Sequence, residues 1–208
     1  MDLTPLKLAG MIGCSSAVAF GTCAFYYWIS LPVASIRGKL ESEFKRTNVT
    51  FLEKDNLEWI NLREKYSKAS NKPKSPEGGD LSLEEVKNWC SENVDAPFKG
   101  AKDPLYEQVK RFCFFNINTI LSELKGKRLI SGIQGDVQWQ DAWGTYNSKK
   151  NSLELSITGY HRDSSLNGSN KVDGGAALYG WCDLTSRKKM YSDDIDVLLP
   201  RFKAWCIV

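Results

Sequence analysis

The sequence is poor in the residues that most enzymes and metal sites use. It has a single histidine among 208 residues, and no two of its six cysteines lie two to four positions apart. Zinc sites need such short spacings, and redox centres use Cys-x-x-Cys. Phosphate loops, nucleophile elbows, dinucleotide glycine patterns and calcium loops are also missing. The sequence therefore predicts no cofactor, no metal and no catalytic residue.

The chain also lacks a strong excess of charge of either sign. It has 28 Lys and Arg residues against 25 Asp and Glu residues, which gives a formal net charge of +3. Proteins that bind nucleic acid usually carry a concentrated basic face, so no nucleic-acid partner is expected. Seven Trp, eight Tyr and nine Phe residues supply enough apolar bulk for a folded core.

Charge is absent altogether from one long segment. Leu8 to Leu31 contains no charged side chain, and about 20 apolar residues in a helix are enough to cross a bilayer. Aromatic residues of the kind that settle at the headgroup level follow at positions 25–28, and Pro32 cannot continue a helix. We predict a signal-anchor transmembrane helix within residues 1–31 that contacts the lipid bilayer through Leu8 to Leu31.

Other interpretations of this segment stay open. A cleaved signal peptide could end at the small residues Val33-Ala34-Ser35, and Met11-Ile12-Gly13-Cys14 loosely resembles a lipoprotein signal. A buried core helix is the third alternative. Orientation is open on charge alone, because basic residues such as Arg37 favour the cytoplasm for the downstream flank, whereas long domains translocate largely regardless of charge.

The remainder of the chain contains a pattern that occurs twice. An aromatic residue precedes a cysteine in Trp89-Cys90, Phe112-Cys113, Trp181-Cys182 and Trp205-Cys206, and the paired cysteines lie 23 and 24 positions apart. Upstream of each pair, a Trp is followed seven residues later by a Tyr, as Trp59 and Tyr66 and as Trp139 and Tyr146. Ile36 and Ile117 precede these Trp residues by 23 and 22 positions.

The repeated order predicts a tandem duplication of one unit. The first copy covers residues 35–113, and the second, diverged copy covers residues 116–208. The alternative is a set of aromatic-rich helices whose spacing only resembles a repeat. Helical Trp and Tyr side chains are more often core residues than parts of an exposed binding patch.

Start and stop signals predict a mainly α architecture with three or four short helices in each copy. Ser82-Leu83-Glu84-Glu85 fits a capping box, and Asp103-Pro104 fits an N-cap followed by proline. Further helices are expected at residues 35–46 and 117–125, and one after Ser192-Asp193-Asp194 that is interrupted or kinked at Pro200. Alternation over residues 151–160 suggests one strand, and residues 67–80 and 163–175 are expected to be loops.

The four cysteines outside the apolar segment allow three pairings. The duplication favours Cys90–Cys113 with Cys182–Cys206, while Cys14 and Cys23 lie in the apolar segment. Each closed loop would stabilise the fold by about 3–4 kcal/mol. Disulfides form in oxidising compartments, so we expect the domain to be extracellular, against the charge rule.

His161 is the one candidate for acid–base catalysis. Asp163 could orient it as a general base, although a histidine in a surface loop explains the residue equally well. The acidic run Asp193, Asp194 and Asp196 is more simply a helix N-terminus than a metal site.

With this order of motifs, the chain resembles the paralogous hypothetical proteins of haemotropic mycoplasmas. The resemblance covers the whole chain and is most specific in the leader at residues 5–13, in Lys87-Asn88-Trp89-Cys90 and in Trp205-Cys206-Ile207. It implies a membrane-anchored, surface-displayed protein of unknown activity, and such proteins have been suspected of contributing to antigenic variety. No motif in it carries chemistry, and Phe112 departs from the family's Trp.

Three functional hypotheses follow from these observations. The first is a non-catalytic, single-pass surface protein that binds a host or envelope protein or serves as exposed antigen. The second is a membrane-tethered envelope hydrolase that uses His161. The third is a membrane scaffold that faces the cytoplasm and keeps its thiols reduced.

Overall fold

The computed structural model describes residues 34–208, and this part of the chain is mainly helical. The elements are, in order, α1 (Ile36–Glu43), β1 (Thr50–Phe51), α2 (Glu58–Asn61), α3 (Arg63–Lys68), α4 (Leu83–Asn93), α5 (Pro104–Cys113), β2 (Phe114–Phe115), α6 (Ile120–Glu123), α7 (Val137–Lys149), α8 (Asp163–Leu166), α9 (Lys171–Ser186) and α10 (Ile195–Trp205).

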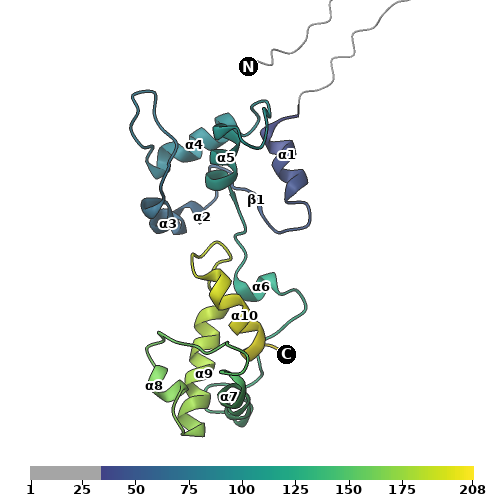
Figure 1. Cartoon of the computed structure of the whole chain (residues 1–208), viewed down its shortest axis with the longest axis vertical. Helices are drawn as coiled ribbons and strands as arrows, with labels where there is room; N and C mark the ends of the chain where they lie inside the picture. The colour runs from purple at the N-terminus through teal and green to yellow at the C-terminus, as the bar shows by residue number, and fades with distance from the viewer. Residues whose placement is uncertain (1–33) are drawn as a thin grey trace, which may run out of the picture.

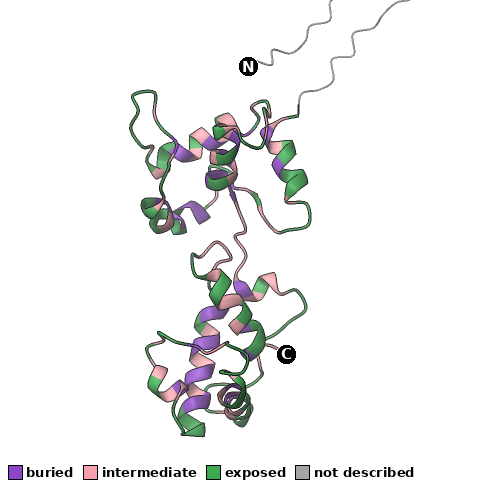
Figure 2. Ribbon diagram, viewed as in Figure 1, coloured by how far each residue is buried: buried purple, intermediate pink, exposed green. Residues whose placement is uncertain are grey.

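Two hydrophobic clusters organise these elements. One lies among α1 to α5 and the other among α6 to α10 (Figure 1). Buried residues occur on one side of the helices in both clusters, and exposed residues cover the outside (Figure 2). We call residues 34–117 the first lobe and residues 118–208 the second lobe.

Local capping chemistry explains where several helices begin. The Ser82 hydroxyl accepts a hydrogen bond from the Glu85 amide, and the Glu85 carboxylate accepts one from the Ser82 amide, so the predicted capping box is confirmed. The Asp103 side chain accepts from the Leu105 amide, and Pro104 is the first residue of α5. These helix starts are therefore encoded by neighbouring residues alone.

Three other predictions of secondary structure are wrong. The helix expected at 117–125 is only the short α6, because Thr119 caps it and the preceding asparagines bond to Glu123. Residues 151–160 form no strand, since Ile157 donates its amide to the Tyr146 hydroxyl instead of to a neighbouring strand. The expected loop at 163–175 contains α8 and the first turn of α9, where the Asn170 side chain caps the helix.

Two smaller differences concern the helices at either end. The first helix ends at Glu43 rather than at residue 46. Pro200 lies inside α10 without ending it. Each lobe contains five described helices rather than three or four.

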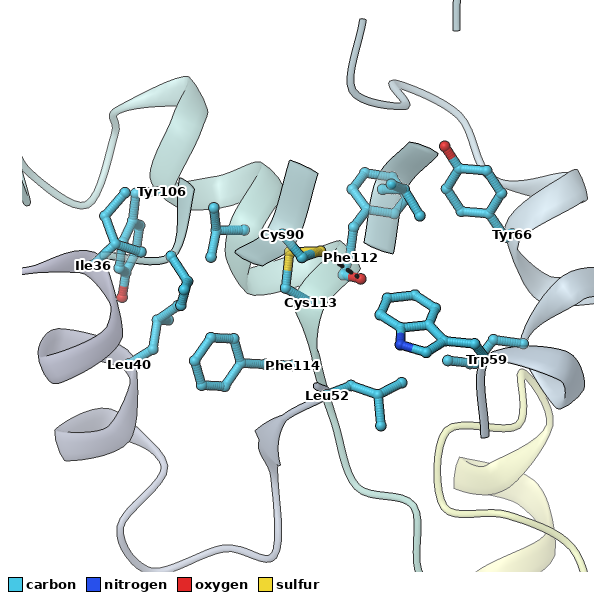
Figure 3. Packing of buried hydrophobic residues seen from close by; sticks show 14 residues of the cluster. Ile36, Leu40, Leu52, Trp59, Tyr66, Cys90, Tyr106, Phe112, Cys113 and Phe114 are labelled. Carbon is cyan, nitrogen blue, oxygen red and sulfur yellow. Dashed lines mark hydrogen bonds between the residues drawn. A yellow bond between two sulfur atoms is a disulfide. The ribbon is translucent and has the colours of Figure 1, made fainter. Parts of the chain in front are cut away.

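Each lobe is closed by one disulfide. Cys90 of α4 is bonded to Cys113 at the end of α5, and Cys182 of α9 is bonded to Cys206 directly after α10. These are the pairs expected from the sequence. Figure 3 shows the first bridge in the middle of its cluster, with Phe112, Trp59 and Tyr66 on one side. All four cysteines are fully buried, so each bridge is part of a core.

No helix within residues 34–208 has the length and apolar character needed to cross a bilayer. The predicted transmembrane segment, Leu8 to Leu31, lies outside the described residues. The alternative cleavage and lipoprotein sites include residues that lie outside them as well.

Candidate functional site

The aromatic residues of the repeated pattern hold equivalent positions in the two lobes. Trp59 donates its indole N–H to the Glu53 carbonyl at 2.9 Å, and Trp139 donates its own to the Gly132 carbonyl at 3.3 Å. Both indoles are 1% exposed. Each Trp thereby ties a helix to the chain segment that enters it, because a buried N–H needs an acceptor.

The Tyr of each pattern meets the aromatic residue that precedes the second cysteine. Tyr66 lies edge-on to Phe112 with ring centroids 5.8 Å apart, and Tyr146 lies edge-on to Trp205 at 5.4 Å. Edge-to-face contacts of this kind stabilise a core beyond the area they bury. Among the eight residues of the pattern, Trp89 is half-buried, and the others, Trp181 included, are buried.

Backbone hydrogen bonds repeat in the same way. The Leu52 amide donates to the Cys113 carbonyl, and the Ile130 amide donates to the Cys206 carbonyl. Strand β1 pairs antiparallel with β2 at this point in the first lobe, and Leu129 forms an antiparallel bridge with Ile207 in the second. The segment before the Trp helix therefore lies beside the segment after the disulfide in both lobes.

The predicted equivalence of Ile36 and Ile117 is wrong. The Ile36 amide donates to the Ala96 carbonyl, and the Ile120 amide donates to the Lys188 carbonyl in the same arrangement. Ile120, not Ile117, is the structural counterpart of Ile36. Spacing alone could not show this, because α6 has only 4 residues whereas α1 has 8, so that Ile120 is nearer to its Trp than Ile36 is.

The two lobes differ where the helix with the first cysteine meets the helix with the Trp. Seven residues before that cysteine, the first lobe has Leu83 and the second has Gly175. A Cβ atom added to Gly175 would lie 2.9 Å from the backbone of Gln140 in α7, so α9 lies directly on α7. In the first lobe, the Leu83 side chain packs against the hydrophobic cluster at the corresponding position.

The first lobe has a cleft of about 340 Å³, whose rim is completed by Asp193 of the second lobe. We call it the aromatic cleft. Its lining consists of Trp59, Leu62, Lys65, Tyr66, Lys68, Ala69, Leu83, Arg111, Phe112, Phe115 and Asp193. Trp59, Tyr66 and Phe112, which belong to the repeated pattern, lie together on one side of the disulfide (Figure 3). The apolar part of the lining thus comes from the core, and the charged part comes from the rim.

Two of the three cations that line the cleft form ion pairs, and the third does not within the described residues. Lys65 forms an ion pair with Asp193, and Lys68 pairs with Glu64 at 2.5 Å. Arg111 has no carboxylate partner within the described residues. Its guanidinium contacts the Ser70 hydroxyl at 3.5 Å and lies over the Phe112 ring. Burial raises the pKa of the Tyr66 hydroxyl to about 12, so the phenol in the cleft is neutral.

A buried carboxylate joins the two lobes beside this cleft. Glu58 of α2 accepts hydrogen bonds from the Tyr191 hydroxyl at 2.6 Å and from the Lys189 ammonium at 2.9 Å. Burial by itself would raise the pKa of Glu58, but these hydrogen bonds outweigh it and hold the pKa below its usual value. The Tyr191 ring also packs edge-on against Phe115 of the first lobe. The loop before α10 is therefore anchored in the first lobe.

A second polar contact lies at the junction of the lobes. Glu123 of α6 accepts from the side-chain amides of Asn48, Asn116 and Asn118 at 2.9 to 3.0 Å. Burial acts to raise its pKa, and the three amide donors together lower it. The two carboxylates, Glu58 and Glu123, thus each bind side chains from the other lobe.

The structure does not assemble a catalytic group around His161. The histidine is exposed and lies edge-on to Tyr160 with ring centroids 4.3 Å apart. Asp163 accepts a hydrogen bond from the Asn167 side chain at 2.9 Å rather than from His161. The pair expected to act together as base and orienting carboxylate is thus not hydrogen-bonded.

The acidic run is divided between two ion pairs. Asp193 pairs with Lys65, and Asp194 lies 3.6 Å from Lys188. Asp194 takes the N-cap position of α10, but its side chain makes no capping hydrogen bond. The described residues contain no group of three His, Cys, Asp or Glu side chains placed to hold a metal ion.

Comparison of the chain with known proteins finds no matching family model, no matching curated protein and no matching solved structure.

Proposed function

We propose that the chain is a membrane-anchored, surface-displayed binding module without catalytic activity of its own. The observation that carries this proposal is the pair of disulfides, Cys90–Cys113 and Cys182–Cys206, each fully buried in a helical core. Such bridges form and persist in oxidising surroundings. An uncharged segment of 24 residues, Leu8 to Leu31, stands before the disulfide-bonded part and would attach it to a bilayer.

The module consists of two tandem copies of one unit. The equivalent indole hydrogen bonds, aromatic pairs and backbone bonds support this, because independent helical bundles would have no reason to repeat them in the same order. A scaffold whose internal framework is the same in both copies tolerates changes in its exposed loops. The partner would be a host or envelope protein, in keeping with the resemblance to surface proteins of haemotropic mycoplasmas.

Protease treatment of intact cells tests the display. The full chain is expressed with a C-terminal epitope tag, and a cytoplasmic protein serves as the control for lysis. We expect the tag to be lost while the cytoplasmic control survives. A tag that resists protease until the membrane is opened would place the module on the cytoplasmic face and contradict the proposal.

Thiol labelling tests the compartment independently. The chain is denatured without reductant and treated with a maleimide that adds a large mass per free thiol. We expect Cys14 and Cys23 at most to react, since the other four cysteines are paired. Labelling of all six cysteines would mean reduced thiols and would favour the cytoplasmic scaffold.

A further inference from the structure

We propose that the aromatic cleft of the first lobe binds a small organic anion. The apolar body of the ligand lies against the aromatic side chains, and its carboxylate or sulfonate group lies on Arg111. This inference deepens the proposed function and rests on it in one respect, that the chain is a binding module. It names the ligand class that one of the two copies takes.

The size and lining of the cleft suit a small molecule. Its volume of about 340 Å³ lies within the range of about 300–1,000 Å³ that is usual for ligand pockets. Trp59 and Phe112 are 1% and 5% exposed, so the apolar side of the cleft is deep rather than a surface patch. These buried rings form the floor of the cleft, and a flat or short apolar group would pack against that floor.

The charges on the rim of the cleft favour a negatively charged ligand. Three cations line the cleft, and Asp193 is the single carboxylate among its lining residues. Two of the cations are occupied by ion pairs, whereas Arg111 is not paired with a carboxylate in the described part of the chain. A guanidinium offers a planar fork of donors that matches a carboxylate or sulfonate. Arg111 is therefore the group expected to hold the anion.

The second lobe keeps the equivalent aromatic residues but lacks the arginine, and its helices are in closer contact. Ala204 takes the place of Arg111, because both lie two residues before the second cysteine of their disulfide. Gly175 replaces Leu83 and brings α9 onto the backbone of α7. The proposal therefore predicts one site per chain, in the first lobe only.

A pair of dyes separates the apolar part of the site from its charged part. 8-Anilinonaphthalene-1-sulfonate and N-phenyl-1-naphthylamine share one aromatic body, and only the former carries the anionic group. The full chain is reconstituted in nanodiscs of neutral lipid and titrated with each dye by fluorescence, with empty nanodiscs as the blank. We expect saturable binding of one sulfonate dye per chain, and weaker binding of the neutral dye.

Arg111→Gln tests the anion contact. Because a hydrogen bond to a charged group is lost, the affinity for the sulfonate dye should fall at least about tenfold, while that for the neutral dye changes by less than about twofold. Lys203→Gln is the control, since it removes an exposed cation next to the counterpart position in α10. It should leave both affinities unchanged. Equal binding of the sulfonate dye by the Arg111→Gln variant and the parent chain would overturn the proposal.

Ala69→Phe tests the apolar part by filling the cleft. Both dyes should lose their saturable binding, and thermal unfolding monitored by circular dichroism verifies that the variant is folded. Leu83→Phe serves if Ala69→Phe does not fold. Binding that survives in a folded, filled variant would place the dye elsewhere and contradict the proposal. The dye result is separable from the protease result, because a displayed module without dye binding refutes the cleft alone, and a protected module with dye binding refutes the display alone.

Discussion

The two lobes share a framework and differ in what the framework encloses. Each has a Trp that ties its helix to the preceding segment, a Tyr edge-on to a second aromatic residue, and a disulfide in the core. In the second lobe, Gly174 and Gly175 let α9 touch α7, and an added Cβ at Gly174 would lie 2.2 Å from the Trp143 ring. In the first lobe, Leu83 takes the place of Gly175 and is one of the residues that line a cleft. The same framework thus encloses a close helix–helix contact in one lobe and a cleft in the other.

The largest expected effect is common to both lobes. Cys90→Ser with Cys113→Ser, and Cys182→Ser with Cys206→Ser, should each lower the free energy of unfolding by about 3–4 kcal/mol, because loops of 23 and 24 residues restrict the unfolded chain almost equally. Denaturant unfolding of the two double variants measures this. A loss below about 1 kcal/mol for one pair would break the equivalence of the lobes.

The contact between the lobes should come next in size. Glu58→Gln removes the charge that Lys189 and Tyr191 bind and should cost about 1.5–3 kcal/mol. Glu53→Gln is the control, because that carboxylate is exposed and its ion pair with Arg37 is long at 3.8 Å. Equal stability of the two variants in denaturant would mean that Glu58 does not join the lobes.

The stabilisation that Glu58 provides should decrease in acid. The pKa of Glu58 is lowered in the folded chain, so its stabilisation is present above the unfolded value of 4.5 and is lost as the pH falls through the lower folded value. The difference in unfolding free energy between the parent chain and Glu58→Gln should therefore shrink as the pH is reduced below about 4.5. A difference that grows on acidification would contradict the assignment.

Two glycines of the second lobe should respond to alanine with opposite signs. Gly175→Ala forces α9 away from Gln140 and should destabilise the chain by about 1–3 kcal/mol. Gly144→Ala adds a methyl group in α7 where no atom lies within 4 Å, and should stabilise it by about 0.5–1 kcal/mol. Thermal unfolding compares the two variants. Stabilisation by both would show that the helices are not in close contact.

The smallest effect is expected at His161. His161→Ala removes an exposed ring that lies edge-on to Tyr160, and should change the unfolding free energy by less than about 0.5 kcal/mol. Dye binding by the cleft should also stay the same. A larger effect on either quantity would give the only histidine a role that its surroundings do not explain.

Features set by neighbouring residues could be predicted from the sequence. The capping box at Ser82 and the Asp103-Pro104 start involve residues within one helical turn, and the cysteine pairs follow from the order of the motifs. The strand predicted at residues 151–160 is wrong because its backbone groups bond to side chains and not to a second strand. The Ile157 amide donates to the Tyr146 hydroxyl, and the Leu155 carbonyl accepts from the Trp205 indole. Trp205 lies 50 residues from Leu155, so local alternation could not reveal this partner.

The cleft could not be predicted because it depends on packing between helices. Phe112 was identified through its cysteine, but Arg111 beside it gave no signal of its own. The contrast between Leu83 and Gly175 can be read from the sequence by counting back from the first cysteine of each disulfide. The close approach of α9 to α7 at Gly175 can be seen only in the structure.

Disulfide mapping of the full chain tests the central claim most directly. The protein is alkylated and digested without reduction, and mass spectrometry identifies the joined peptides; Lys125 and Lys127 allow trypsin to separate the two lobes. The account predicts Cys90 joined to Cys113 and Cys182 joined to Cys206, with none of the four alkylated. A bridge that crosses from one lobe to the other, or free thiols at these positions, would contradict it.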